Sequence, residues 1–179
     1  MATTYDMSTG DKFQTLFVTG LKNAHALEKQ ALSIMTPQAE RIVHYPEVAE
    51  RLRAHIEETR VQVDRIDEIL QGFDEKASAW KDMGLGIMGE LAAVGHSVAG
   101  DEIMKNSFAN YAFEHFEIAS YKSLITMAED GGFGSAVPLL QQTLREEQAM
   151  AEWIDQSLPL VTRRYSELYV REGASQAKI

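Results

Sequence analysis

The sequence contains no cysteine among its 179 residues. This absence excludes disulfide bonds, thiolate metal sites and cysteine nucleophiles. The side chains left for metal binding are the carboxylates of 27 Asp and Glu residues and the imidazoles of five His residues. Any metal chemistry would therefore use hard oxygen ligands with some imidazole nitrogen, a combination that suits iron and manganese.

Long apolar runs and basic tracts are also missing. No stretch approaches the roughly 18 apolar residues that a membrane-spanning helix needs, and residues 1–10 lack the basic and apolar segments of a signal peptide. Lys and Arg number 17 against 27 acids, which gives a formal net charge of −10. We therefore expect a cytoplasmic protein that binds neither membranes nor nucleic acid.

Proline and glycine are scarce, at 4 and 12 residues, and they interrupt the chain at only a few places. Between these interruptions, apolar residues recur at spacings of three and four, which is typical of helices joined by short loops. The pattern predicts four long helices, at about residues 11–35, 46–72, 101–129 and from 138 past 158. We expect Pro37 to stop the first helix and Pro159 to end or kink the fourth.

A shorter helical segment, at about residues 85–98, lies between the two halves in a glycine-rich stretch. Two long helices, a crossover and two more long helices describe an all-α, ferritin-like four-helix bundle with an extra shorter helix in its long crossover. A chain of this length holds one domain. We assign residues 1–10 to a flexible N-terminus, 11–165 to the bundle domain and 166–179 to a C-terminal tail.

Two acidic residues occupy places on apolar helix faces where core residues are expected. With about 100° of rotation per residue, Glu147 lies within about 20° of the centre of an apolar stripe that includes Leu144. Glu28 lies in the same way between Ala24 and Leu32. An unpaired buried carboxylate is unfavourable, so such a residue pairs with a charge, takes up a proton or binds a metal.

The second and third helices offer further candidates. In the third, Glu117 shares a direction with apolar residues and Glu114 lies next to it, so we favour Glu117 as a ligand with Glu114 as a close second. In the second, His55 and Glu58 are three residues apart and can meet one metal from one helix face. Glu58 itself lies about 120° from the centre of the apolar stripe. Tyr111 and Tyr121 are expected in the core with hydrogen-bonded hydroxyls, where either could also line an iron site.

Each of the four long helices thus offers a carboxylate, and one adds a histidine, which is close to the ligand set of di-iron carboxylate bundles. The candidate metal ligands are Glu28, His55, Glu58, Glu114, Glu117 and Glu147, with Glu146 as the alternative to Glu147. The order His55-x-x-Glu58 is the reverse of the usual Glu-x-x-His. A simpler interpretation of any single acid is a boundary residue or half of an ion pair. His25, His44 and His96 are most simply surface or packing residues.

Four segments, taken in order, resemble the YciE/YciF group of ferritin-like bacterial stress proteins. The resemblance covers about residues 13–158 and rests on Glu28-Lys29-Gln30, residues 55–65, residues 114–121 and residues 143–147. It implies a ferritin-like bundle, commonly dimeric, with a metal site formed by the motif carboxylates and His55, and a link to stress responses. The sequence departs from the group in the crossover, where Met88-Gly89-Glu90 replaces Met-Glu-Gly, which puts in doubt any role for an acid there.

The leading hypothesis is a non-haem di-iron protein that binds Fe(II), with manganese as the other suitable metal, and lets O2 or peroxide oxidise the iron during stress. Such a protein would be a ferroxidase-like oxidoreductase. The alternative is a non-catalytic helical bundle that acts through self-association or a partner, with any metal purely structural. A homodimer fits because the third helix is apolar around more than half of its circumference, with Phe108, Phe113, Phe116 and Ile118 on it.

Overall fold

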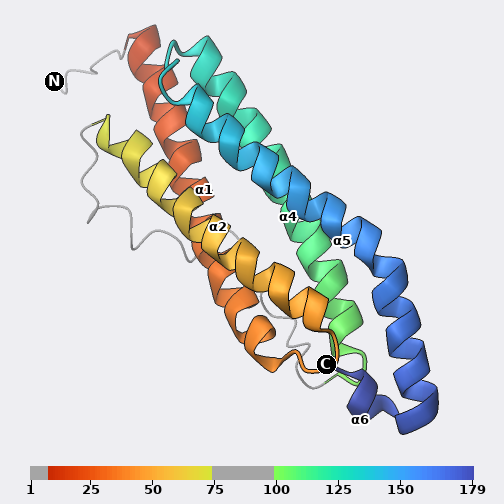
Figure 1. Cartoon of the computed structure of the whole chain (residues 1–179). Coiled ribbons are helices and arrows are strands. Elements are labelled where there is room, and N and C mark those ends of the chain that lie inside the picture. Colours follow the sequence, from red (N-terminus) through yellow and green to blue (C-terminus); the bar gives the residue numbers. More distant parts are fainter. Residues whose placement is uncertain (1–7, 74–98) are drawn as a thin grey trace, which may run out of the picture.

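The computed structural model describes residues 8–73 and 99–179. These residues form four long helices and one short helix (Figure 1). Their bounds are Thr9–Arg41 for α1, Pro46–Gln71 for α2, Glu102–Asp130 for α4, Val137–Glu172 for α5 and Ala174–Ala177 for α6. The expected all-α bundle is confirmed, and the described residues contain no strand. The helix expected at 85–98, which includes Glu90 and His96, lies outside the described residues.

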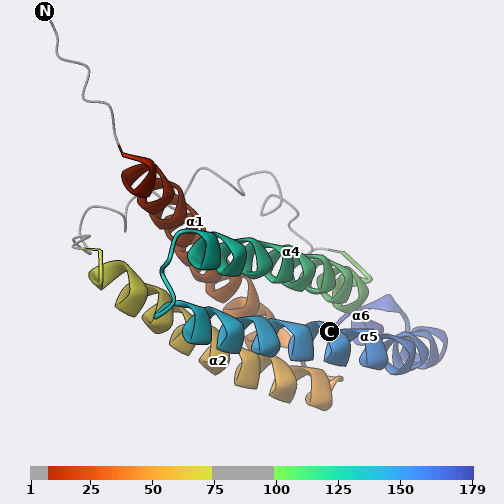
Figure 2. The ribbon, with the colours of Figure 1, turned by 90° about the horizontal axis from the view of Figure 1, so that it is seen from above.

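The long helices form two antiparallel pairs, α1 with α2 and α4 with α5 (Figure 1 and Figure 2). Each pair is joined by a short loop, whereas α4 begins at the opposite end of the bundle from the end of α2, with residues 72–101 between them in the chain. This connectivity is the one found in ferritin-like bundles. The two pairs meet mainly through α1 and α4. Gly20 permits this approach, since a Cβ atom there would lie 2.8 Å from Cδ2 of Leu124.

Among the described helices, none combines the length and apolarity that crossing a membrane requires.

Two prolines lie inside helices, where the sequence predicted an interruption. α1 runs through Pro37, so the expected stop at this proline is wrong. α5 likewise continues past Pro159. Both prolines are exposed, and residues that follow them pack inward, Ala39 in α1 and Val161 in α5. Because tertiary packing supplies most of the stability of a helix, burial of these residues offsets the backbone hydrogen bond that each proline removes.

The outer ends of α1 and α5 also differ from the expected bounds. α1 begins with a capping box, in which Ser8 Oγ accepts the Asp11 N–H at 3.2 Å and Asp11 Oδ2 accepts the Ser8 N–H at 3.1 Å. Residues 166–179, assigned from the sequence to a tail, complete α5 and form α6. Gly173 makes the turn between these helices with φ of 84°, a conformation that glycine adopts without strain.

The C-terminal segment packs against the end of the bundle where α1 meets α2 and where α4 begins. Tyr45 donates a hydrogen bond to the carbonyl of Ala177 at 2.6 Å, and both residues are buried. Glu102, the buried first residue of α4, accepts a hydrogen bond from Arg41 at 2.7 Å and lies 3.4 Å from Nζ of Lys178. The chain end therefore ties several helix ends together.

Apolar side chains fill the bundle in three clusters along its length. The first includes Phe17, Leu21, Leu70, Leu124 and Leu140, the second Met35, Leu52, Met150 and Ile154, and the third Tyr45, Ile103, Val161 and Leu168. In each long helix, buried polar side chains lie between or beside the residues of the first and second clusters. Eight of them form what we call the polar layer: Glu28, His55, Thr59, Gln62, Glu114, Glu117, Thr143 and Glu147.

Tyr45→Phe should lower the free energy of unfolding by about 1–2 kcal/mol, because it leaves the buried carbonyl of Ala177 without its donor. For a chain of this size the melting temperature should fall by roughly 2–8 °C, measured by circular dichroism. Tyr169→Phe is the matched control, since Tyr169 is 52% exposed. Equal melting temperatures for the two variants would show that the bond to the C-terminal segment adds no stability.

Candidate metal centre

The polar layer brings together ionisable side chains from all four long helices. Glu28 comes from α1, His55 from α2, Glu114 and Glu117 from α4, and Glu147 from α5. None of the five is more than 2% exposed. Each helix crosses the layer with its inward face, and the two α4 residues share that face because they are three positions apart. The layer is therefore a direct product of helical spacing.

His55 contacts acids through both of its ring nitrogens. Its Nε2 lies 3.3 Å from Oε2 of Glu114 and 3.7 Å from Oε2 of Glu147. Its Nδ1 lies 2.8 Å from Oε2 of Glu58. Glu58 is 36% exposed and also accepts a hydrogen bond from Arg51 at 3.1 Å. One side of the imidazole thus faces the buried acids, while the other faces a partly exposed, charge-paired carboxylate.

Three of these residues have the spacing of metal ligands. His55, Glu114 and Glu147 each offer one ligand atom, and the three atoms lie within 4.8 Å of one another. No second group of this kind occurs in residues 8–73 and 99–179. One imidazole nitrogen with carboxylate oxygens is a donor set that iron and manganese accept. The arrangement can therefore hold a divalent cation.

Several carboxylate oxygens in the layer lack a hydrogen-bond donor. Tyr121 donates its hydroxyl to Oε1 of Glu28. Within the part of the chain that the structure describes, Oε2 of Glu28, Oε1 of Glu117 and both carboxylate oxygens of Glu147 have no hydrogen-bond partner. Such groups are rare in folded proteins because burial without a partner is unfavourable. A bound cation would satisfy them, so the residues present fit a metal.

Glu28, Glu117 and Glu147 resist ionisation. Burial raises the pKa of Glu28 from 4.5 to about 8, although the hydrogen bond from Tyr121 opposes the shift. Burial also raises the pKa of Glu117 and of Glu147, and the charges of neighbouring carboxylates raise both further. All three shifts have the same cause: ionised carboxylates that are buried together lose their hydration and repel one another.

The same surroundings favour the charged form of His55, whereas they favour the neutral form of these three acids. Burial alone lowers the pKa of this imidazole, but its hydrogen bonds and charge interactions with Glu114 and Glu58 outweigh burial and raise the pKa to about 9. The hydrogen bond from His55, in turn, lowers the pKa of Glu58. In the absence of a metal the layer thus favours bound protons, which a metal would have to displace.

The structure distinguishes Glu147 from its neighbour Glu146. Arg65 donates two hydrogen bonds to the Glu146 carboxylate, at 2.6 and 2.9 Å, and Gln62 donates a third at 3.1 Å. Glu146 is thus neutralised at the edge of the layer, while Glu147 lies inside it. The sequence analysis did not predict a role for Gln62 or Arg65. Because they follow His55 by two and nearly three helical turns, their spacing could have placed them on the same face of α2 as His55.

The other sequence candidates lie apart from the three-residue group. Among the polar-layer residues, Glu58 contacts only His55, at Nδ1, the ring nitrogen that faces away from Glu114 and Glu147. This agrees with the predicted position of Glu58 away from the apolar stripe. His25 is buried with its Nε2 3.3 Å from Oδ1 of Asp67, and His44 lies in the connection between α1 and α2. Five of the six predicted ligands are therefore in the polar layer, and Glu58 lies at its edge.

The chain matches the sequence model of a family described as "Domain of unknown function (DUF892)" over residues 12–167. The chain belongs to the DUF892 family. It is also 31% identical over 140 residues to "Protein YciF" of Escherichia coli (strain K12), a match that covers 76% of this chain and 84% of that protein. The resemblance to the YciE/YciF group is thereby confirmed.

Solved structures share the bundle of this DUF892 domain. A protein from Xanthomonas campestris pv. campestris matches with a TM-score of 0.72 and 29% identity, over 87% of this chain and 96% of that chain. The E. coli stress protein YciF matches with a TM-score of 0.64 and 26% identity, over 85% and 96% of the respective chains. YcfI from Rhodopseudomonas palustris gives 0.66 and 25%, over 86% and 98%.

The metal-free protein should lose stability as the pH rises from about 5 to about 8. The folded state holds a proton on Glu28, whose pKa is about 8 there against a usual 4.5, whereas the unfolded chain releases that proton. Each proton held in this way lowers the free energy of unfolding by about 1.4 kcal/mol per pH unit across the window.

Urea unfolding in the presence of a chelator would measure this slope. Glu28→Gln should flatten the slope, because the amide does not titrate and because its neutral side chain no longer raises the pKa of Glu117 and Glu147. The control is Glu57→Gln in α2, whose side chain is 68% exposed and which should keep the wild-type slope. A Glu28→Gln protein that loses stability as steeply as the wild type would contradict the assignment of the raised pKa to Glu28.

Proposed function

We propose that this DUF892 protein binds iron in the polar layer and lets O2 or peroxide oxidise Fe(II), with manganese as the other suitable metal. The observation that carries the proposal is the set of buried carboxylate oxygens without donors around His55, supplied by all four helices. Iron supplies the electrons of the reaction, since each Fe(II) gives up one electron as it becomes Fe(III). The number of electrons that O2 accepts favours two iron ions over one.

In this proposal the chain supplies ligands and manages protons. Nε2 of His55 and the carboxylates of Glu114 and Glu147 hold the metal, with Glu28 and Glu117 beside them for a second ion. Protons on these residues leave when the metal binds, because a ligand must present a free lone pair. The apolar clusters on both sides keep bulk water out of the layer.

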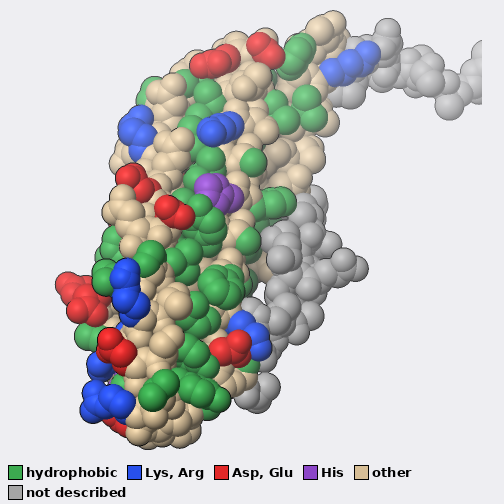
Figure 3. All heavy atoms as spheres, turned by 90° about the vertical axis from the view of Figure 1, so that its right-hand side faces the viewer, with side chains coloured by type: hydrophobic (Ala, Val, Ile, Leu, Met, Phe, Trp, Pro, Cys, Tyr) green, Lys and Arg blue, Asp and Glu red, His purple; other side chains and the backbone are tan. Residues whose placement is uncertain are grey.

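The setting of the reaction is inferred from the relatives. One solved structure is described as the E. coli stress protein YciF, and we extend that role to this chain, in the cytoplasm. Nucleic acid is not an expected partner. On the face shown in Figure 3, basic and acidic side chains are interspersed and form no basic tract among the described residues. The net charge of −10 agrees with this view.

A second candidate function is self-association without catalysis, and α4 carries the observation that favours it. Phe108 and Phe116 are 53% and 47% exposed, and they lie about two turns apart on that helix. Exposed aromatic side chains of this kind mark protein contacts when they form a patch. We propose that a second copy of the chain covers them, which would give a homodimer compatible with either function.

Glu147→Gln should slow aerobic Fe(II) oxidation at least about tenfold, since loss of a metal-binding carboxylate weakens the site by that order or more. The rate would be followed by oxygen uptake and by the loss of chelatable Fe(II) after addition to metal-free protein. Glu146→Gln is the matched control, the same change one residue away at a carboxylate that Arg65 holds. It should oxidise Fe(II) at close to the wild-type rate.

Anaerobic titration calorimetry with Fe(II) and Mn(II) separates the two candidate functions. Binding by the wild type without any acceleration of oxidation would refute the catalytic proposal and favour a structural metal. Equal oxidation by the Glu147→Gln and Glu146→Gln proteins would refute the assigned site. Absence of binding by the wild-type protein would leave self-association as the function.

A further inference from the structure

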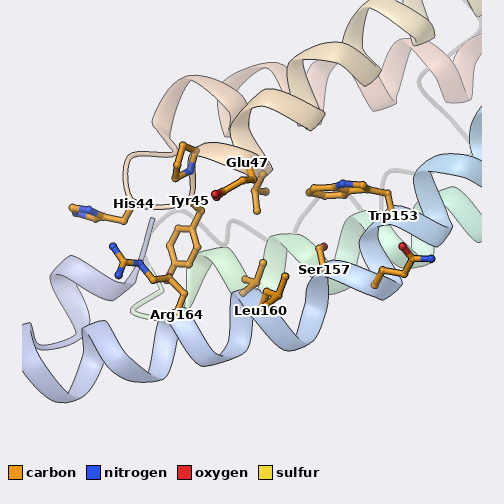
Figure 4. A pocket seen from close by; sticks show the side chains of 11 residues that line it. His44, Tyr45, Glu47, Trp153, Ser157, Leu160 and Arg164 are labelled. Carbon is orange, nitrogen blue, oxygen red and sulfur yellow. The ribbon is translucent and has the colours of Figure 1, made fainter.

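A cavity of about 700 Å³ lies between the start of α2 and the second half of α5 (Figure 4). Its volume is in the range of small-molecule sites. Most of its lining is apolar, with Val48 on the α2 side and Trp153, Leu160 and Val161 on the α5 side. Trp153 follows Glu147 by six residues, about 9 Å along the helix axis, so the cavity is separate from the polar layer.

The charged groups of the cavity are placed unevenly. Arg164 and His44 lie at one end and Trp153 at the other, with Glu47 on the α2 side (Figure 4). The His44 ring is engaged, since its Nε2 lies 3.1 Å from Oε1 of Gln176. Arg164 has no carboxylate within ion-pair distance anywhere in the described part of the chain. Its guanidinium therefore keeps its donors for a ligand.

We propose that this cavity binds a small amphipathic carboxylate. The carboxylate group lies on Arg164, whose planar guanidinium pairs with carboxylates through two parallel hydrogen bonds. The apolar chain of the ligand runs past Leu160 toward Trp153, and Val48 is a further apolar residue of the lining. Glu47 repels further negative charge, so the ligand carries a single anionic group at the Arg164 end. This inference does not depend on the metal site.

The experiment uses Trp153 as a reporter in the full-length chain. The protein has two tryptophans, and Trp80→Phe leaves Trp153 as the single one. Sodium decanoate should change its fluorescence saturably. Decyltrimethylammonium, with the same chain length and the opposite charge, should bind at least about tenfold more weakly, since a charge-assisted hydrogen bond contributes about that factor.

Three substitutions in the same background test the placement of the charges. Arg164→Gln should weaken decanoate binding at least about tenfold for the reason just given. Glu47→Gln should tighten it, because the repelling charge is removed. Arg163→Gln is the matched control, since Arg163 is exposed and lies outside the cavity lining. Circular dichroism melts check that all three variants fold.

Two outcomes would overturn the proposal. Equal affinity for decanoate and decyltrimethylammonium, or unchanged decanoate affinity in Arg164→Gln, would show an apolar surface without carboxylate recognition. The other outcome is that the wild type shows no saturable decanoate binding and sediments as a dimer, which Arg164→Gln or Leu160→Asp dissociates. This result would show that a second copy of the chain covers the cavity.

Discussion

Four buried carboxylates surround His55 at one level of the bundle, with apolar clusters on either side. In such low-dielectric surroundings like charges repel strongly and an ionised carboxylate loses its hydration. The layer therefore opposes folding unless it holds protons or a cation. The raised pKa values of Glu28, Glu117, Glu147 and the His55 imidazole are the response of the metal-free chain to that constraint.

The rest of the fold keeps these side chains at the same level. The register of α5 matters most, because a rotation by one residue, about 100°, would exchange Glu147 for Glu146. In the observed register Arg65 donates hydrogen bonds to Glu146 at the edge of the layer, and Glu147 lies inside it. α1 and α5 also continue through prolines, and the C-terminal segment ties the ends of several helices together at Tyr45 and Glu102. A site that costs stability thus lies in a bundle whose apolar clusters and C-terminal contacts offset the cost.

The sequence patterns predicted part of this site. The predictions that were wrong or incomplete have physical causes. Glu28 and Glu147 interrupt narrow apolar stripes, so periodicity alone placed them inside. α4 is apolar on several sides, which left Glu114 and Glu117 unresolved, and the structure buries both. The helix ends expected at the two internal prolines were wrong, because burial of the residues that follow each proline stabilises the helix more than the lost backbone hydrogen bond destabilises it. The bond from Tyr45 to the C-terminal segment spans 132 residues, and no local pattern predicts such a contact.

We propose that the polar layer is a metal site. Crystals grown with Fe(II) under anaerobic conditions, measured on both sides of the iron absorption edge, test it most directly. We expect anomalous peaks inside the layer, within bonding distance of Nε2 of His55 and of the carboxylates of Glu114 and Glu147. A fully loaded crystal with iron only at the protein surface, and with Nε2 of His55 still paired with these acids, would contradict this proposal.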